Sequence, residues 1–262
     1  MTEAEDWWAT AISDISPGSI RLRGYAIEDL IGSVSYPQMV WLMTRGSLPS
    51  AAEAALLELT LVAAVDHGPQ APSVAAARMA ASCGLDLNNA MATGVNLLGD
   101  VHGGAGQQCM EVLRSLVDSG QPVGAAATAL VAAYKERGAY VPGFGHRFHP
   151  RDPRRDPLMT AIAEAVADGT VEGRYVEAAL ALEAVLAGGA RPVPMNIDGA
   201  TATIYCELGF APELGRGLFV LSRSVGLLAH AWEQHNEPTR IKGPLPRSAN
   251  PTYTGPPPRT LP

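Results

Sequence analysis

The chain has 262 residues, of which 47% are hydrophobic and 17% are charged, and its formal net charge is -7. High apolar content with a small net charge excludes a mainly disordered chain, and the acidic balance excludes a general nucleic-acid-binding protein. Three cysteines are too few for a disulfide scaffold, and they favour reduced thiols in a cytoplasmic protein.

The sequence predicts neither a membrane span nor a secretory signal. The apolar stretches at 56–65 and 179–187 are too short to cross a bilayer, and each contains a glutamate. The first residues, MTEAEDWW, are acidic where a secretory signal is basic. We therefore expect a cytoplasmic protein that does not bind a membrane.

Capping signals predict two helices near the start of the chain. Ser35 and Gln38 form a capping box, and Gly46 is a typical helix end. Ser50 and Glu53 form a second capping box before a run of leucines and valines. The one strand signal in this region, and in the chain, is SIRL at 19–22.

The rest of the chain is also predicted to be helical. Apolar periodicity favours helices over 72–83, 86–98, 106–119, 122–137, 174–187 and 199–208. Asp156 followed by Pro157 predicts a helix start with Gly169 as its end, and Pro212 opens a long helix to about Gln234. The proline-rich tail at 243–262 is either disordered or an extended arm on a partner chain. The fold class is therefore all-α.

Three glycine-rich breaks between helices carry polar side chains that suit acid–base chemistry. They are DVHGGAG at 100–106, VPGFGHR at 141–147 with the arginine-rich run to 155, and PMNIDG at 194–199. Glycines let a backbone approach a ligand, and a helix start favours an anion. Alone, each of these histidines and the aspartate is more typical of packing or capping, and the arginines of a solvated loop.

A metal site built from His146, His149 and Asp152 is disfavoured. Pro150 and Pro153 interrupt the helix that would align these three side chains. We therefore predict no metal site.

Taken in order, the motifs resemble the citrate synthase superfamily, over nearly the whole chain from about residue 20 to 240. The matching segments are VHGGAG, VPGFGHR with RDPR, NIDG and SRSVGLLAH, with RGYAIEDL and DHGPQAPSVAAARMAASCG upstream. The chain is shorter than full citrate synthases and is most similar to the short citryl-CoA lyase-like members, such as the module that closes ATP-citrate lyase.

The resemblance implies a helical fold with two domains. Residues 1–105 and 203–262 would form a large domain, and residues 106–202 would form a small one. The active site would lie in the cleft between them. The resemblance also implies a homodimer with a shared active site.

The resemblance assigns roles to individual residues. His102 matches the histidine at the thioester oxygen, His146 the histidine at the hydroxyl or keto oxygen of the other substrate half, and Asp198 the carboxylate that exchanges the methyl proton. The positions that hold substrate carboxylates are His67, Arg154, Arg223 and Arg240. The loop along coenzyme A is Val141, Pro142, Gly143, Phe144 and Gly145. A coenzyme A thioester is a substrate, and no prosthetic group is implied.

The implied reaction is the cleavage of citryl-CoA, or a close analogue, to acetyl-CoA and oxaloacetate by a retro-Claisen mechanism. One alternative is a citrate synthase-type enzyme that condenses an acyl-CoA with a 2-oxo acid such as oxaloacetate. A third interpretation is a non-catalytic relative that binds a coenzyme A ester.

Overall fold

The computed structural model describes residues 6–189, 191–246, 248–249 and 252–260. The chain divides into two compact units, one of residues 1–65 with 99–223 and the other of residues 66–98 with 224–262. Helices dominate both units, so the predicted all-α class is confirmed. The boundaries of the predicted large and small domains differ from those of these two units. The division into units does not test the predicted domains, so they stay a prediction.

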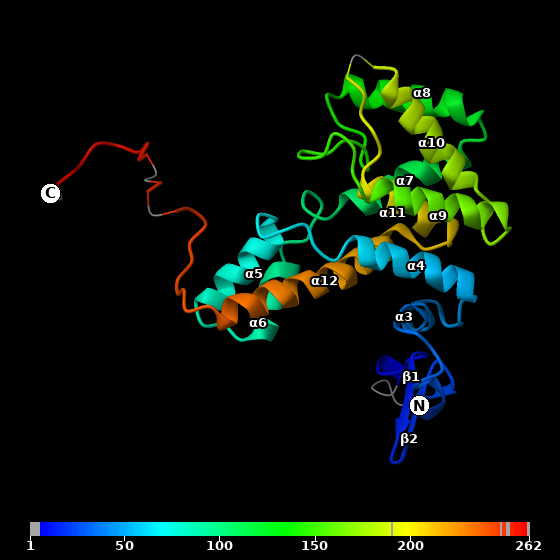
Figure 1. The fold of residues 1–262 in the computed structure, drawn as a ribbon, viewed down its shortest axis with the longest axis horizontal. Helices are drawn as coiled ribbons and strands as arrows, with labels where there is room; N and C mark the ends of the chain where they lie inside the picture. Colours follow the sequence, from blue (N-terminus) through cyan, green and yellow to red (C-terminus); the bar gives the residue numbers. More distant parts are fainter. Residues whose placement is uncertain (1–5, 190, 247, 250–251, 261–262) are drawn as a thin grey trace. The chain divides into compact units, whose positions relative to one another are not determined.

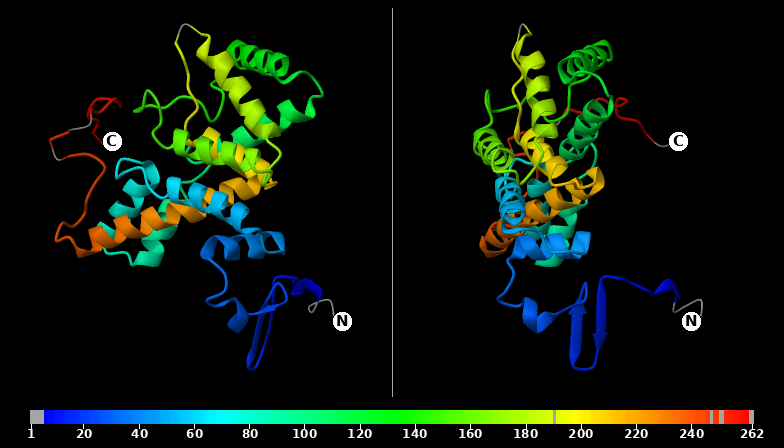
Figure 2. Two further views of the ribbon diagram at one scale, coloured as in Figure 1. Left: turned by 45° about the vertical axis from the view of Figure 1, so that its right-hand side comes forward. Right: turned by 90° about the vertical axis from the view of Figure 1, so that its right-hand side faces the viewer.

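The first unit begins with a small antiparallel sheet of β1 (Ser13–Ser16), β2 (Ser19–Leu22) and β3 (Tyr25–Ala26), in that order. Ser13 pairs with Leu22 and Ser16 with Ser19, so two residues make the first turn. The sequence predicted only β2, because β1 (SDIS) contains a single apolar residue and β3 has only two residues, too few for an alternating pattern. The right-hand view of Figure 2 shows the two longer strands, in blue, side by side.

Three helices follow the sheet, namely α2 (Ile27–Leu30), α3 (Tyr36–Arg45) and α4 (Ala51–Ala63). Both predicted capping boxes are confirmed. The Ser35 N–H donates to Gln38 Oε1 at 2.8 Å, and the Ser50 N–H donates to Glu53 Oε2 at 2.7 Å. Gly46 ends α3 in the left-handed conformation, at φ 86°.

The core of the first unit is built around α11 (Ile197–Glu207). Nine of its eleven residues are buried, and it packs against α4 and against three more helices of the same unit. These are α7 (Ala105–Asp118), α9 (Arg155–Ala167) and α10 (Arg174–Ala187), and α8 (Val123–Glu136) packs on α7 and α10 (Figure 1). A helix this enclosed is a rigid support for any side chain on its first turn.

Helix α9 begins one residue before the predicted start at Asp156. The Asp152 carboxylate accepts the Arg154 N–H at 3.0 Å, and the Asp152 carbonyl accepts the Arg155 N–H at 3.1 Å, so the turn forms upstream. Asp156 lies inside the first turn, where its carboxylate pairs with Arg151 at 2.6 Å. The capping role predicted for Asp156 is therefore wrong, because Arg154 is the residue that precedes the helix.

The second unit contains α5 (Pro72–Ser82), α6 (Leu87–Val95) and the part of α12 (Pro212–Asn236) that follows Arg223. Both views of Figure 2 show these three helices side by side. A Cβ at Gly94 would lie 2.9 Å from the Ser73 carbonyl, so glycine permits this close packing. After α12 the Ile241 N–H donates to the Ser82 carbonyl at 3.0 Å, which ties the chain back to α5.

Among the described residues, no helix is long and apolar enough to cross a bilayer.

Glu207 caps α10 across the core, and replacing it should destabilise the first unit. Its carboxylate accepts the N–H groups of Gly173, Tyr175 and Val176 at 2.7 to 3.0 Å. Because three N–H groups lose their acceptor, we expect Glu207→Ala to lower the free energy of unfolding by about 2 kcal/mol, measured by urea denaturation. Glu177→Ala, on the exposed first turn of α10, is the control and should change it by less than about 0.5 kcal/mol. Equal losses would contradict the capping role.

Candidate functional site

The first turn of α11 positions Asp198. Asn196 precedes the helix in an extended conformation, and its Oδ1 accepts the N–H groups of Asp198 at 2.9 Å and Gly199 at 3.2 Å. Its Nδ2 donates to the Gly145 carbonyl at 2.6 Å. One side chain therefore caps the helix and joins it to the glycine-rich loop that precedes His146.

The segment Val141–Gly145 docks against the start of α11 through its backbone. The Asn196 N–H donates to the Gly143 carbonyl at 3.0 Å, and the Gly145 N–H donates to the Pro194 carbonyl at 2.7 Å. Gly143 has φ +86°, and a Cβ there would lie 2.6 Å from Cys109 Sγ and 2.9 Å from Gly199 Cα. The glycines of this motif therefore serve close backbone packing, and the predicted role along coenzyme A stays a prediction.

Asp152 is a buried carboxylate that joins Arg154 to α11. It accepts Nε and Nη2 of Arg154 at 2.9 and 2.8 Å, and the Ile197 N–H at 3.0 Å. Burial would raise the pKa of Asp152, but these hydrogen bonds and the Arg154 charge hold it at about 2. The carboxylate therefore stabilises the folded chain above about pH 4, and this contribution is lost as the pH falls toward 2.

Asp198 is half-buried beside charges of both signs. Burial raises the pKa of its carboxyl group, the positive charges of Arg154 and Arg223 oppose this rise, and the Asp152 charge adds to it. A Cβ at Gly106 would lie 3.8 Å from Asp198 Oδ1, so the VHGGAG motif reaches the Asp198 carboxylate. A carboxylate with a raised pKa suits general acid–base catalysis near neutral pH.

His102 lies in the loop before α7. Gly104, the residue before that helix, has no room for a side chain, because a Cβ would lie 2.6 Å from the Asp100 carbonyl oxygen. Burial lowers the pKa of His102, and the Arg223 charge lowers it further. The imidazole is therefore neutral at pH 7, which suits a hydrogen-bond donor to an oxygen that gains negative charge.

Arg223 is the charge that His102 and Asp198 share. Its residue is only 5% exposed, its Nε donates to the Ala64 carbonyl at 3.2 Å, and its guanidinium lies 5.1 Å from the centre of the Phe219 ring. The Arg223 charge acts on both His102 and Asp198. The segments DVHGGAG and PMNIDG, which carry these two residues, therefore both lie near the Arg223 guanidinium.

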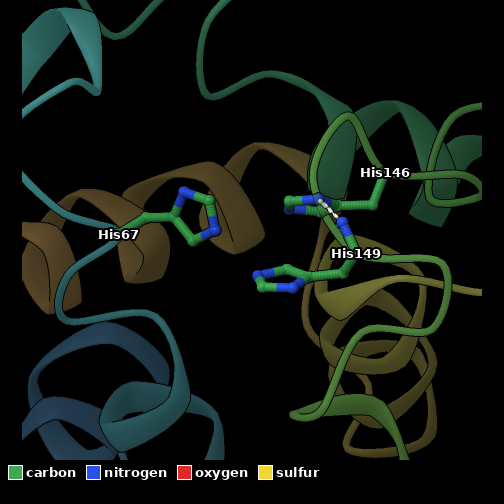
Figure 3. Close-up of side chains that lie close together, drawn as sticks. All are labelled: His67, His146 and His149. Atoms are coloured by element: carbon green, nitrogen blue, oxygen red, sulfur yellow. Dashed lines mark hydrogen bonds between the residues drawn. The ribbon is translucent and has the colours of Figure 1, made fainter.

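His146 has one ring nitrogen held by the backbone. The N–H groups of Phe148 and His149 donate to His146 Nδ1 at 3.0 and 3.1 Å, and Figure 3 shows the bond from His149. Because backbone N–H groups can only donate, the neutral ring carries its proton on Nε2. The His149 ring lies 4.6 Å away, centre to centre, a neighbour to which the sequence assigned no role.

The metal alternative at His146, His149 and Asp152 conflicts with the hydrogen bonds. Both oxygens of Asp152 already accept protein donors, as described above. His146 Nδ1 also accepts backbone N–H groups.

The predicted residues divide between the two units. His102, His146, Arg154, Asp198 and Arg223 belong to the first unit, with the loop at 141–145, and the electrostatic effects link Asp198 with Arg154 and Arg223, and His102 with Arg223.

The remaining two predicted residues belong to the second unit. His67 lies in the loop before α5, and Arg240 is exposed beyond the end of α12.

Sequence reasoning missed the positioning roles of Asp152 and Asn196. The signal for Asn196 was present, because an asparagine two residues before an aspartate at a helix start is typical of a cap. The role of Asp152 had no local signal, since its partner Ile197 is 45 residues away.

Comparison with known proteins gives the family. Residues 49–245 match the family described as "Citrate synthase, C-terminal domain". The chain belongs to the citrate synthase family. Citrate synthase from Haloferax volcanii is 31% identical over 215 residues, which cover 81% of this chain and 53% of that protein. The chain spans between about a third and just over half of the length of the curated relatives it matches.

Two solved structures of the family are similar to this one. Citryl-CoA lyase from Hydrogenobacter thermophilus has a TM-score of 0.86 and 33% identity, and the match covers 97% of each chain. Citrate synthase from Thermoplasma acidophilum, in a ternary complex with carboxymethyl coenzyme A and oxaloacetate, has a TM-score of 0.69 and 25% identity. That match covers 86% of this chain and 60% of the other. The predicted superfamily is therefore confirmed.

Gly143→Ala should damage the docked loop. The clash of a Cβ with Cys109 and Gly199, together with the positive φ, should lower the free energy of unfolding by about 2 kcal/mol or more. The control is Gly217→Ala in α12, where a Cβ meets nothing within 4 Å. This substitution should raise the free energy of unfolding by up to about 1 kcal/mol. Thermal and urea unfolding measure both. Equal behaviour of the two variants would contradict the close packing.

Proposed function

We propose that this chain cleaves citryl-CoA, or a close analogue, to acetyl-CoA and oxaloacetate. The observation that carries the proposal is the end-to-end similarity to a citryl-CoA lyase, which covers 97% of each chain. Other family members extend well beyond the matched region. The chemical character of His102, Asp198 and the arginines supports the same reaction.

Cleavage breaks the bond between the carbinol carbon of citryl-CoA and the methylene carbon next to the thioester. The hydroxyl proton leaves to His146, and the O–H electron pair forms the keto group of oxaloacetate. The electrons of the broken bond form the enolate of acetyl-CoA, whose negatively charged oxygen accepts a hydrogen bond from neutral His102. Asp198 then donates a proton to the methylene carbon, which completes the methyl group. No water is consumed.

The remaining predicted residues bind the two halves of the substrate. Arg154 and Arg223 would hold carboxylates in bidentate fashion, with His67 and Arg240 adding further contacts. The loop at 141–145 would run along coenzyme A, which is a substrate and not a resident cofactor. A cytoplasmic homodimer with a shared active site completes this proposal.

One observation favours the condensing alternative, in which an acyl-CoA and a 2-oxo acid are joined. His146 Nδ1 accepts two backbone N–H groups, so the neutral ring holds its proton on Nε2. This is the state that donates a proton to a keto oxygen during condensation. Cleavage runs through the same groups in reverse, and it requires Nε2 to be unprotonated before it accepts the hydroxyl proton.

Two separate assays decide between the directions. With citryl-CoA, we expect oxaloacetate and acetyl-CoA to form in equal amounts without free thiol, measured by a coupled malate dehydrogenase assay and by a thiol reagent. With acetyl-CoA and oxaloacetate, we expect no release of free coenzyme A. Thiol release from the second mixture without cleavage in the first would replace the lyase with a synthase. Binding of citryl-CoA without turnover would support the non-catalytic alternative.

Asp198→Asn should nearly abolish cleavage. The amide cannot donate the proton to the methylene carbon, so we expect kcat to fall about a thousandfold while the melting temperature changes little. Asp29→Asn, the same substitution at an exposed position of α2, is the control and should keep full activity. Unchanged turnover in Asp198→Asn would remove the role assigned to this residue.

The pH dependence of cleavage should report on Asp198. Because its protonated form is the donor, the rate should fall as the pH rises through its raised pKa. Asp152→Asn removes a negative charge that raises the pKa of Asp198, and it frees Arg154, whose positive charge lowers that pKa. Both changes lower the pKa of Asp198, so the fall in rate should move to lower pH. Steady-state profiles of kcat measure this shift, with Asp29→Asn as the control. A profile that stays in place would show that another group controls the rate.

A further inference from the structure

His230 is held at both ring nitrogens, although the sequence assigned it no role. It lies in the last third of α12, where Arg78 Nη1 of α5 is 3.1 Å from its Nδ1. Its Nε2 is 3.3 Å from Asp66 Oδ2. Because a guanidinium can only donate, Nδ1 is the acceptor in this pair, and the proton on Nε2 points to the Asp66 carboxylate.

The Asp66 carboxylate holds the backbone of the loop that carries His67. Its Oδ2 accepts the Gly68 N–H at 2.9 Å, and Gly68 has φ +86°, which a glycine adopts readily. Burial would raise the pKa of Asp66, but the hydrogen bonds from Gly68, His230 and the His67 N–H together lower it. The carboxylate therefore accepts donors from both sides, with the loop on one side and α12 on the other.

Arg78 is itself fixed, so it can hold His230. Its side chain is 12% exposed and forms ion pairs with Glu233, and with Glu237 at 3.4 Å. These carboxylates keep the guanidinium against the last turns of α12 and the residue that follows them. The result is a continuous polar chain within the second unit, from the glutamates through Arg78, His230 and Asp66 to the backbone at His67.

We propose that His230 is a positioning residue for His67. The inference rests on the proposed function, in which His67 binds a carboxylate of oxaloacetate or citrate. A ligand-binding side chain on a short loop loses conformational freedom when it binds, and a loop fixed in advance reduces that cost. His230 fixes the loop through Asp66, so its effect on substrate must pass through His67.

Equilibrium binding tests this role without requiring turnover. We expect His230→Leu to weaken citrate and oxaloacetate binding about tenfold, as expected for the loss of one hydrogen bond to a charged group, and to leave coenzyme A binding unchanged. His230→Gln keeps a donor and an acceptor, so it should restore most of the affinity. Isothermal titration calorimetry measures each constant, and thermal unfolding checks that each variant folds. The matched control is His235→Leu, which replaces an exposed histidine of the same helix.

A double-mutant cycle separates action through His67 from a general structural effect. In a His67→Ala background, His230→Leu should cause no further loss of citrate affinity, because the residue it positions is absent. Additive losses, or equal losses in His230→Leu and His235→Leu, would overturn the inference and leave the proposed function intact. A wild-type chain that binds neither citrate nor oxaloacetate would overturn both.

Discussion

The candidate site depends on how the first N–H groups of α11 are satisfied. Helix starts leave N–H groups without partners inside the helix, and two side chains from this unit supply acceptors here. Asp152 accepts the N–H of Ile197, and Asn196 accepts those of Asp198 and Gly199. Because these acceptors also hold Arg154 and the loop carbonyl of Gly145, the helix, the arginine and the loop form one assembly.

This assembly also determines the electrostatics around Asp198. Asp152 and Asp198 both lie near Arg154, yet the pKa of Asp152 is lowered to about 2 and that of Asp198 is raised. The difference arises because Asp152 accepts hydrogen bonds directly from Arg154, whereas the arginines act on Asp198 only through their charge. One carboxylate is thus kept ionised as a structural anchor, and the other remains able to exchange a proton.

The second unit shows the same principle with different residues. A carboxylate, Asp66, accepts backbone donors of a turn, and a side chain from a neighbouring helix holds it. In both units an acidic residue close in sequence to a predicted ligand-binding side chain accepts hydrogen bonds from the protein. Such contacts limit the orientations that the loop can adopt, which matters for a site whose ligands carry several negative charges.

The sequence by itself determined the helical class, the two capping boxes and most helix ranges, because these depend on residues within a few positions of one another. It also indicated the superfamily, because the motifs occur in a recognisable order. Only the tertiary structure decided that Asp152 reaches Ile197, that Gly143 touches Gly199, that Arg223 lies near both His102 and Asp198, and that His230 holds Asp66. These pairs are separated by tens of residues or more, and their hydrogen bonds, burial and charge arise from packing, which no local pattern records.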